Sequence, residues 1–278
     1  MTLPHLTKKQ FRILILIYNF RFIDRKQIQT ILKHKNHRRI HSWLTDLVTK
    51  NCIERIYSTK MPENTKPAVY YLGKYGRKHL QKYFTGESTK KSDDEEQKKE
   101  SNETALYQLT KTYKDSQRTE VFRANCLALV DCYLVCKRYV TENGYTQEFF
   151  PLTGCAKKEL FKKFDSYVMI KKKNGRKKSY ALIYLTHRTP RRFTRYRIAE
   201  IIKFFQQEWD YESDQPYPTI LIICSNSPIR NYAKKVFESK LEYYGHPELT
   251  IRLATLFDFK KDGLDGNIWI QPKNEEEY

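Results

Sequence analysis

The sequence predicts a mixed α/β (α+β) protein made of two domains. Apolar residues recur at helical spacing over most of the first 84 residues and end in two short alternating runs. Amphipathic helices and apolar strands return after residue 105. Between them, residues 85–104 contain no aromatic and no aliphatic side chain. Such a segment cannot bury enough apolar area to offset its ordering entropy. We therefore expect a flexible charged linker over 85–104 that joins domains of residues 1–84 and 105–278.

The charge of the chain points to a polyanionic partner. Its 278 residues include 52 Lys and Arg against 32 Asp and Glu, a net charge of +20, and residues 1–84 hold 18 basic against 4 acidic side chains. This excess favours nucleic acid first and an acidic membrane surface second. No apolar run reaches the roughly 18 residues of a spanning helix, and the six cysteines form no C-x-x-C pair. We expect a cytoplasmic protein with no membrane partner and with buried, reduced cysteines.

The first domain opens with three predicted helices. Thr7 and Gln10 have the spacing of a capping box, and Asp24 and Gln27 form a second one. Asn36 is placed to cap the third helix, which carries one apolar stripe. That stripe consists of Ile40, Trp43, Leu44, Leu47 and Val48.

Two alternating runs, IERIYS and AVYYL, follow the third helix and predict a strand pair. The loop between them contains Lys60 and Lys66, and residues 74–84 predict a closing helix. Three helices followed by a hairpin with a basic tip are typical of a winged helix-turn-helix. In that fold the third helix enters the major groove of double-stranded DNA. The alternative is a fold that binds protein and whose charge is only solvated.

The predicted DNA-binding residues of this domain lie on the polar side of the third helix and in the wing. They are His37, Arg38, Arg39, His41, Ser42 and Thr45 in the helix, and Lys60 and Lys66 in the wing. Arginine reaches guanine or phosphate, and Ser and Thr take either role. The spacing of His34, His37 and His41 also fits a metal site, but the neighbouring arginines repel a cation. We expect no bound metal.

The second domain is predicted as an α/β sheet with helical cover. A helix over 115–138 precedes a hairpin with its turn at Asn174-Gly175. The remaining elements alternate between helix and strand. They are a helix over about 193–209, a strand over 219–224, a helix through 233–240 and a strand over 250–256. No aromatic ladder for stacking single strands is evident.

The hairpin raises the question of catalysis. Asp165 opens its first strand, as in many metal-dependent nucleases, which need a second carboxylate converging on Mg²⁺. Residues 166–199 contain no Asp or Glu, and the second strand offers Tyr184 and Thr186 instead. The interval is basic, which favours phosphate over a cation. Its predicted DNA-binding residues are Lys171, Lys172, Lys173, Arg176, Arg188, Arg191 and Arg192.

This layout resembles the plasmid replication-relaxation family, which places a winged helix before a restriction-endonuclease-like α/β domain. The resemblance rests on segments in order along the chain. They are LTKKQFRILILIYNFRFIDRKQI, YYLGKYGRKHL, FDSYVMI, YLTHRT, RIAEIIKFF, PYPTILIIC and GNIWIQP. Asp165 and Thr189 match the family pattern, whereas its acidic positions fall on Tyr184 and Thr186. The resemblance implies action on plasmid or mobile-element DNA at an origin of replication or of transfer.

We therefore predict a double-stranded DNA-binding accessory factor whose nuclease-like domain binds without cutting, with no catalytic residues and no cofactor. A relaxase or a replication initiator is a candidate partner. The sequence leaves open whether the chain forms a homodimer. The first alternative is an endonuclease or nickase that uses Mg²⁺ with Asp165 and Glu200. The second is a transcriptional repressor whose second domain only oligomerises.

Overall fold

The computed structural model describes residues 2–61, 65–86, 95–150, 163–207, 217–244 and 249–272. It is a mixed α/β protein with two sheets, as the sequence predicted. The chain divides into two compact units, Met1–Val130 and Asp131–Tyr278. The division falls inside helix α6 (Glu120–Asn143).

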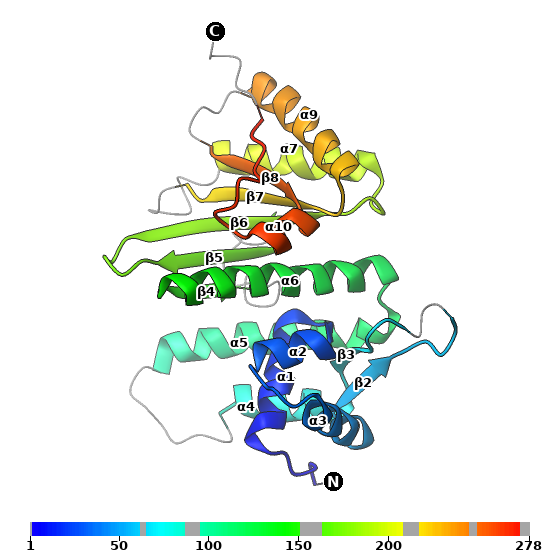
Figure 1. Ribbon diagram of the computed structural model, residues 1–278. Coiled ribbons are helices and arrows are strands. Elements are labelled where there is room, and N and C mark those ends of the chain that lie inside the picture. Colours follow the sequence, from blue (N-terminus) through cyan, green and yellow to red (C-terminus); the bar gives the residue numbers. More distant parts are fainter. Residues whose placement is uncertain are drawn as a thin grey trace. The chain divides into compact units, whose positions relative to one another are not determined.

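The first unit combines helices with a small antiparallel sheet of strand order β1-β3-β2 (Figure 1). Its elements up to residue 84 are α1 (Lys8–Phe20), β1 (Ile23–Asp24), α2 (Arg25–Ile31), α3 (His37–Thr49), β2 (Ile53–Ile56), β3 (Val69–Leu72) and α4 (Lys74–Phe84). The predicted strand pair is confirmed as β2 and β3, with Ile53 opposite Leu72. β1 was not predicted.

The helix starts of this unit follow the predicted caps. Thr7 and Gln10 form a complete capping box at α1, and Asp24 and Gln27 form another at α2. In each box the side chain of the cap accepts from the third helical amide while the glutamine accepts from the cap amide. These bonds satisfy amides that a helix start otherwise leaves without partners.

The first unit extends well beyond the predicted boundary at residue 84. It continues through α5 (Glu95–Lys111), a 3₁₀ helix (Thr112–Gln117) and the beginning of α6. Four contacts attach this extension to α1, α2 and their junction. Tyr18 Oη donates to Ala105 O (3.0 Å), Arg21 pairs with Asp115, the Phe22 and Phe122 rings lie 6.1 Å apart, and Gln27 Nε2 donates to Leu127 O (2.9 Å). Residues 105–130 therefore belong with the first domain rather than the second.

The predicted linker is only partly described. Residues 95–104 form the first part of α5, where the sequence predicted coil; Glu and Lys, which abound there, are good helix formers. Residues 87–94 lie outside the described part of the chain. The flexibility of the 85–104 segment stays a prediction.

The second unit is built on a mixed sheet of strand order β4-β5-β6-β7-β8. Neighbours from β4 to β6 are antiparallel, and those from β6 to β8 are parallel. Besides α6, its elements are β4 (Thr146–Phe150), β5 (Ser166–Lys171), β6 (Lys177–Leu185), α7 (Arg191–Gln207), β7 (Thr219–Cys224), α9 (Ser227–Tyr244), β8 (Ile251–Thr255) and α10 (Leu256–Asp262). β4 and α10 were not predicted, and α6 begins at Glu120 rather than at Asp115.

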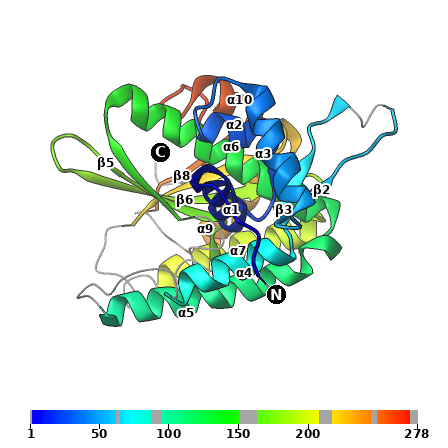
Figure 2. The same ribbon diagram turned by 90° about the horizontal axis from the view of Figure 1, so that it is seen from below.

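Helices cover both faces of this sheet, with α7 and α9 on one side and α10 and the part of α6 from Asp131 on the other (Figure 2). The side chains of Ile183, Ile222 and Leu253 form a core with α7 and α9. Five cysteines are free and buried, as predicted, and Cys155 lies outside the described residues. None of the described helices is long and apolar enough to span a membrane.

Candidate nucleic-acid interface

Helix α3 is held by its cap and by one apolar side. Asn36 Oδ1 accepts from the amides of Arg38 (2.9 Å) and Arg39 (3.2 Å). Ile40, Leu44 and Leu47 are fully buried. These contacts fix the rotation of the helix, and therefore which side chains face outward.

The outward side carries every predicted contact residue of the helix. His37, Arg38, Arg39, His41, Ser42 and Thr45 are all exposed. Within the described residues, neither guanidinium group of Arg38 and Arg39 has an ion-pair or hydrogen-bond partner. His41 Nδ1 and Thr45 Oγ1 are 3.0 Å apart and bond to each other. The exposed side thus offers cationic donors that no neighbouring carboxylate neutralises.

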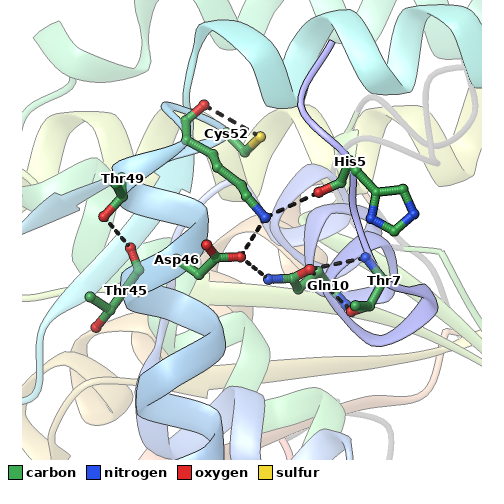
Figure 3. Close-up of polar contacts among 8 residues, drawn as sticks. His5, Thr7, Gln10, Thr45, Asp46, Thr49 and Cys52 are labelled. Atoms are coloured by element: carbon green, nitrogen blue, oxygen red, sulfur yellow. Dashed lines mark hydrogen bonds and ion pairs between the residues drawn. The ribbon is translucent and has the colours of Figure 1, made fainter.

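The single acidic residue of α3 is held against α1 (Figure 3). Asp46 Oδ2 accepts from Gln10 Nε2 (2.5 Å) and from Lys50 Nζ (2.7 Å). Lys50 Nζ also donates to His5 O (3.1 Å), and Gln10 Oε1 accepts from the Thr7 amide (3.0 Å). The hydrogen bond from Lys50 lowers the pKa of Asp46. The capping box of α1 therefore also positions α3.

The loop between β2 and β3 carries the predicted wing lysines. Lys60 and Lys66 are both exposed, and residues 62–64 between them lie outside the described residues. The Lys60 amide donates to Ser58 Oγ (3.2 Å), which shapes the first limb of the loop. DNA contact by either lysine stays a prediction.

The predicted basic residues of the second unit fall into two groups rather than one surface. Lys171, Lys172, Lys173 and Arg176 lie at the turn between β5 and β6, which Gly175 closes with φ +81°. Arg188, Arg191 and Arg192 follow the other end of β6. β6 is nine residues long, so at about 3.3 Å per residue the groups are about 30 Å apart. All of these side chains are exposed except Lys172, which is half-buried.

Asp165 lies where β5 begins, and both of its oxygens have partners. Oδ2 accepts from the Tyr184 amide (2.7 Å), and Oδ1 pairs with Arg197 Nη2 (2.8 Å). Glu200, the other candidate catalytic residue, pairs with Lys163 (3.3 Å). Burial raises the pKa of the Tyr184 phenol to about 12, so this side chain stays neutral at physiological pH. The chain presents an Arg–Asp pair where a nuclease would present converging carboxylates.

The first histidine near α3 has contacts within the protein. His34 Nδ1 lies 3.0 Å from Asn36 O, and its ring lies 5.1 Å from that of Trp43. Among the described residues, no group of three or more His, Cys, Asp or Glu side chains is placed to hold a metal ion.

Two exposed aromatic residues were missed by the sequence analysis. Phe193 and Tyr196 on α7 are 52% and 66% exposed. The segment RRFTRYR contained a signal for this exposure. Thr194 and Ile198 begin the buried side of α7, and neither Phe193 nor Tyr196 falls on that side at helical spacing.

The molecule thus combines a first unit of helices and a small antiparallel sheet, whose third helix is capped and basic, with a second unit built on a mixed sheet. The family model described as replication-relaxation matches residues 14–113 of the chain, which confirms the family resemblance predicted from the sequence. The matched segment runs from α1 into the 3₁₀ helix and so includes residues beyond the predicted boundary at 84. The family implies a role in plasmid replication or mobilisation. No curated protein and no solved structure matches the chain significantly.

Proposed function

We propose that this protein binds double-stranded DNA of a plasmid or other mobile element and acts as an accessory factor at its origin of replication or transfer. The observation that carries the proposal is the exposed side of α3. It presents Arg38 and Arg39 beside a capped helix start, while its one carboxylate, Asp46, is bound to Gln10 and Lys50. The replication-relaxation match supports the process.

The element order of the first unit supports a winged helix as the DNA-binding fold. α1, α2 and α3 are followed by the β2–β3 pair, and β1 completes the sheet. In this fold the start of the third helix approaches base edges in the major groove. Arg38 and Arg39 would contact guanine or phosphate, Ser42 and Thr45 would assist, and the wing lysines would bind flanking phosphates.

The second unit, in this proposal, binds without cleaving. Its element order from α6 to β7, with antiparallel strands leading into a parallel pair, agrees with the nuclease-like fold expected from the family resemblance. Asp165 is engaged by Arg197 and the Tyr184 amide. Tyr184 in β6 and Thr186 just after it stand where a second carboxylate would be expected. A relaxase or a replication initiator is the partner that such a unit would recruit.

The experiment is a footprint of the full chain on the DNA of the element that encodes it. Arg38→Ala/Arg39→Ala should abolish protection of a specific site, because binding weakens by about 1–3 kcal/mol for each base that the arginines no longer touch. Lys8→Ala/Lys9→Ala is the charge-matched control, because both lysines are exposed at the start of α1. This control should weaken binding of all sequences slightly and leave the protected site unchanged.

Equal effects of the two double variants would exclude α3 as the reading helix. The position of the protected site distinguishes an accessory role at an origin from the alternative, transcriptional repression. Protection at an origin supports the accessory role, whereas protection confined to a promoter would make the protein a repressor.

A further inference from the structure

Helix α7 is anchored to the sheet by one side. Ile198, Ile201, Ile202 and Phe205 are buried in the core that α7 shares with α9 and the sheet. Thr194, one turn before Ile198, is also buried. Because the inward side is fixed, the residues between these positions must point away from the sheet.

The outward side at the start of α7 presents two aromatic rings. Phe193 is 52% exposed and Tyr196 is 66% exposed. At a spacing of three residues their Cβ atoms lie about 5–6 Å apart, so the rings are neighbours on the helix surface. Both rings are therefore open to solvent at the start of the helix.

Exposed arginines accompany these rings at the start of α7. The Arg192 guanidinium lies 4.9 Å from the centre of the Phe193 ring. Arg191 lies 5.1 Å from the centre of the Tyr232 ring on α9. Arg195, which precedes Tyr196 on the same helix, is also exposed. The sequence has no Asp or Glu between Ser166 and Ala199. Glu200, four residues after Tyr196, is paired with Lys163 (3.3 Å), so the side chains around the rings leave a net positive charge.

We propose that this side of α7 binds single-stranded DNA, with bases stacked on Phe193 and Tyr196 and phosphates bound by Arg191, Arg192 and Arg195. Interleaved aromatic and cationic side chains are the chemistry by which proteins hold unpaired strands. Bases of a duplex are stacked on one another and cannot offer their faces to a ring, so duplex DNA would use the arginines alone. A protein partner would need acidic groups against three arginines.

This inference rests on the proposed function and extends it. It differs from the sequence analysis, which found no stacking surface because composition alone does not tell which aromatic residues lie outside the core. The chain would then bind duplex DNA through α3 and an unpaired strand through α7. Both forms of DNA occur at an origin that is being opened.

The experiment measures binding of the full chain to a labelled oligothymidine by fluorescence anisotropy. Phe193→Ala/Tyr196→Ala should bind at least about tenfold more weakly, because each stacked base contributes about that factor or more. Phe193→Tyr/Tyr196→Phe keeps both rings and should bind as the parent does. Tyr243→Ala is the matched control. Tyr243 is 77% exposed near the C-terminal end of α9, and its replacement should leave oligothymidine binding unchanged.

A second arm uses the duplex that carries the footprinted site. The Phe193→Ala/Tyr196→Ala variant should bind this duplex like the parent, because α3 lies in the first unit and keeps all of its side chains. Oligothymidine binding that is unchanged in this variant would overturn the inference and assign the surface to a protein partner. A parent that binds oligothymidine but no duplex would instead overturn the proposed function and leave this inference standing.

Discussion

Arg197 and Asp165 form an ion pair that closes a ring with the backbone of Tyr184. Arg197 Nη2 lies 2.8 Å from Asp165 Oδ1, and Arg197 Nη1 donates to Tyr184 O (3.4 Å). The Tyr184 amide completes the ring by donating to Asp165 Oδ2 (2.7 Å). A carboxylate held by a guanidinium and an amide has a structural partner at each oxygen.

The first prediction is that the protein does not cut DNA. Supercoiled plasmid incubated with the full chain in Mg²⁺, and then in Mn²⁺, should stay intact, because a single carboxylate among arginines gives a divalent cation too few anionic ligands. Arg197→Ala, which frees Asp165 Oδ1, should also leave the plasmid intact.

Two variants make this cleavage test decisive. Nicking that disappears in both Asp165→Ala and Glu200→Ala would establish the nuclease. Nicking that persists in both would identify a contaminant. The measurement is the fraction of plasmid converted to the open circle.

The second prediction concerns the buried pair Arg21–Asp115, which joins α1 to the 3₁₀ helix. Their side chains are 5% and 0% exposed, and Arg21 Nη2 also donates to Lys111 O (3.0 Å). Arg21→Met should lower the free energy of unfolding by about 3–5 kcal/mol, because it leaves the Asp115 carboxylate buried without its partner. Arg21→Met/Asp115→Leu should recover most of this loss. Urea unfolding measures the stability of both variants. If Arg21→Met is as stable as the parent, the prediction is wrong.

The third prediction concerns Gly76 in α4. A Cβ atom at this position would lie 2.0 Å from Cys52 O, the same carbonyl oxygen that accepts from the Gly73 amide at 2.9 Å. Gly-to-Ala changes inside a helix ordinarily stabilise by about 1 kcal/mol. Here Gly76→Ala should destabilise by about 1–3 kcal/mol, because backbone must shift. Gln81→Ala, exposed on the same helix, should be nearly neutral in the same urea experiment.

The fourth prediction is a pH dependence that arises from Asp46. The hydrogen bond from Lys50 lowers the pKa of Asp46. The contribution of the ionised carboxylate to the free energy of unfolding is therefore fully present above the ordinary Asp pKa, and it is lost as the pH falls through the lowered value. The stability difference between the parent and Asp46→Asn should therefore shrink as the medium is acidified. Lys50→Met removes the hydrogen bond that lowers the pKa of Asp46, so the dependence of stability on pH should be weaker in this variant. If the stability difference between the parent and Asp46→Asn is the same at neutral and acidic pH, ionised Asp46 does not stabilise the fold.

The parts of the fold that the sequence predicted are set by residues close together in the chain. The boxes at Thr7 and Asp24 and the turn at Gly175 depend on neighbours within a few positions. The apolar run around Ile13–Ile17 was less informative. With every position apolar, the spacing could not show that Ile13 and Ile17 are fully buried while Ile15 is only half-buried.

What was missed depends on partners far apart in sequence. Asp115 was assigned to a long helix, but its partner Arg21 lies 94 positions earlier. β1 has two residues and exists through its pairing with β3, where Ile23 lies opposite Tyr70. No local pattern reveals such contacts.

The same distinction holds for the candidate site. The outward side of α3 followed from helical spacing and its exposure is confirmed, whereas its contact with DNA stays a prediction. The Arg197–Asp165 pair could not be foreseen, because Arg197 stood in the sequence as one basic residue among many. The division of the basic residues into two groups became visible only with the length of β6.

The nine residues of β6 also set the length that a duplex would need to reach both basic groups of the second unit. Its two basic ends are about 30 Å apart, which at about 3.4 Å per base pair corresponds to about nine base pairs of duplex. We therefore expect a duplex shorter than this to reach Arg176 or Arg191 but not both. The proposed contact of the second unit with DNA would then depend on the length of the duplex rather than on its sequence.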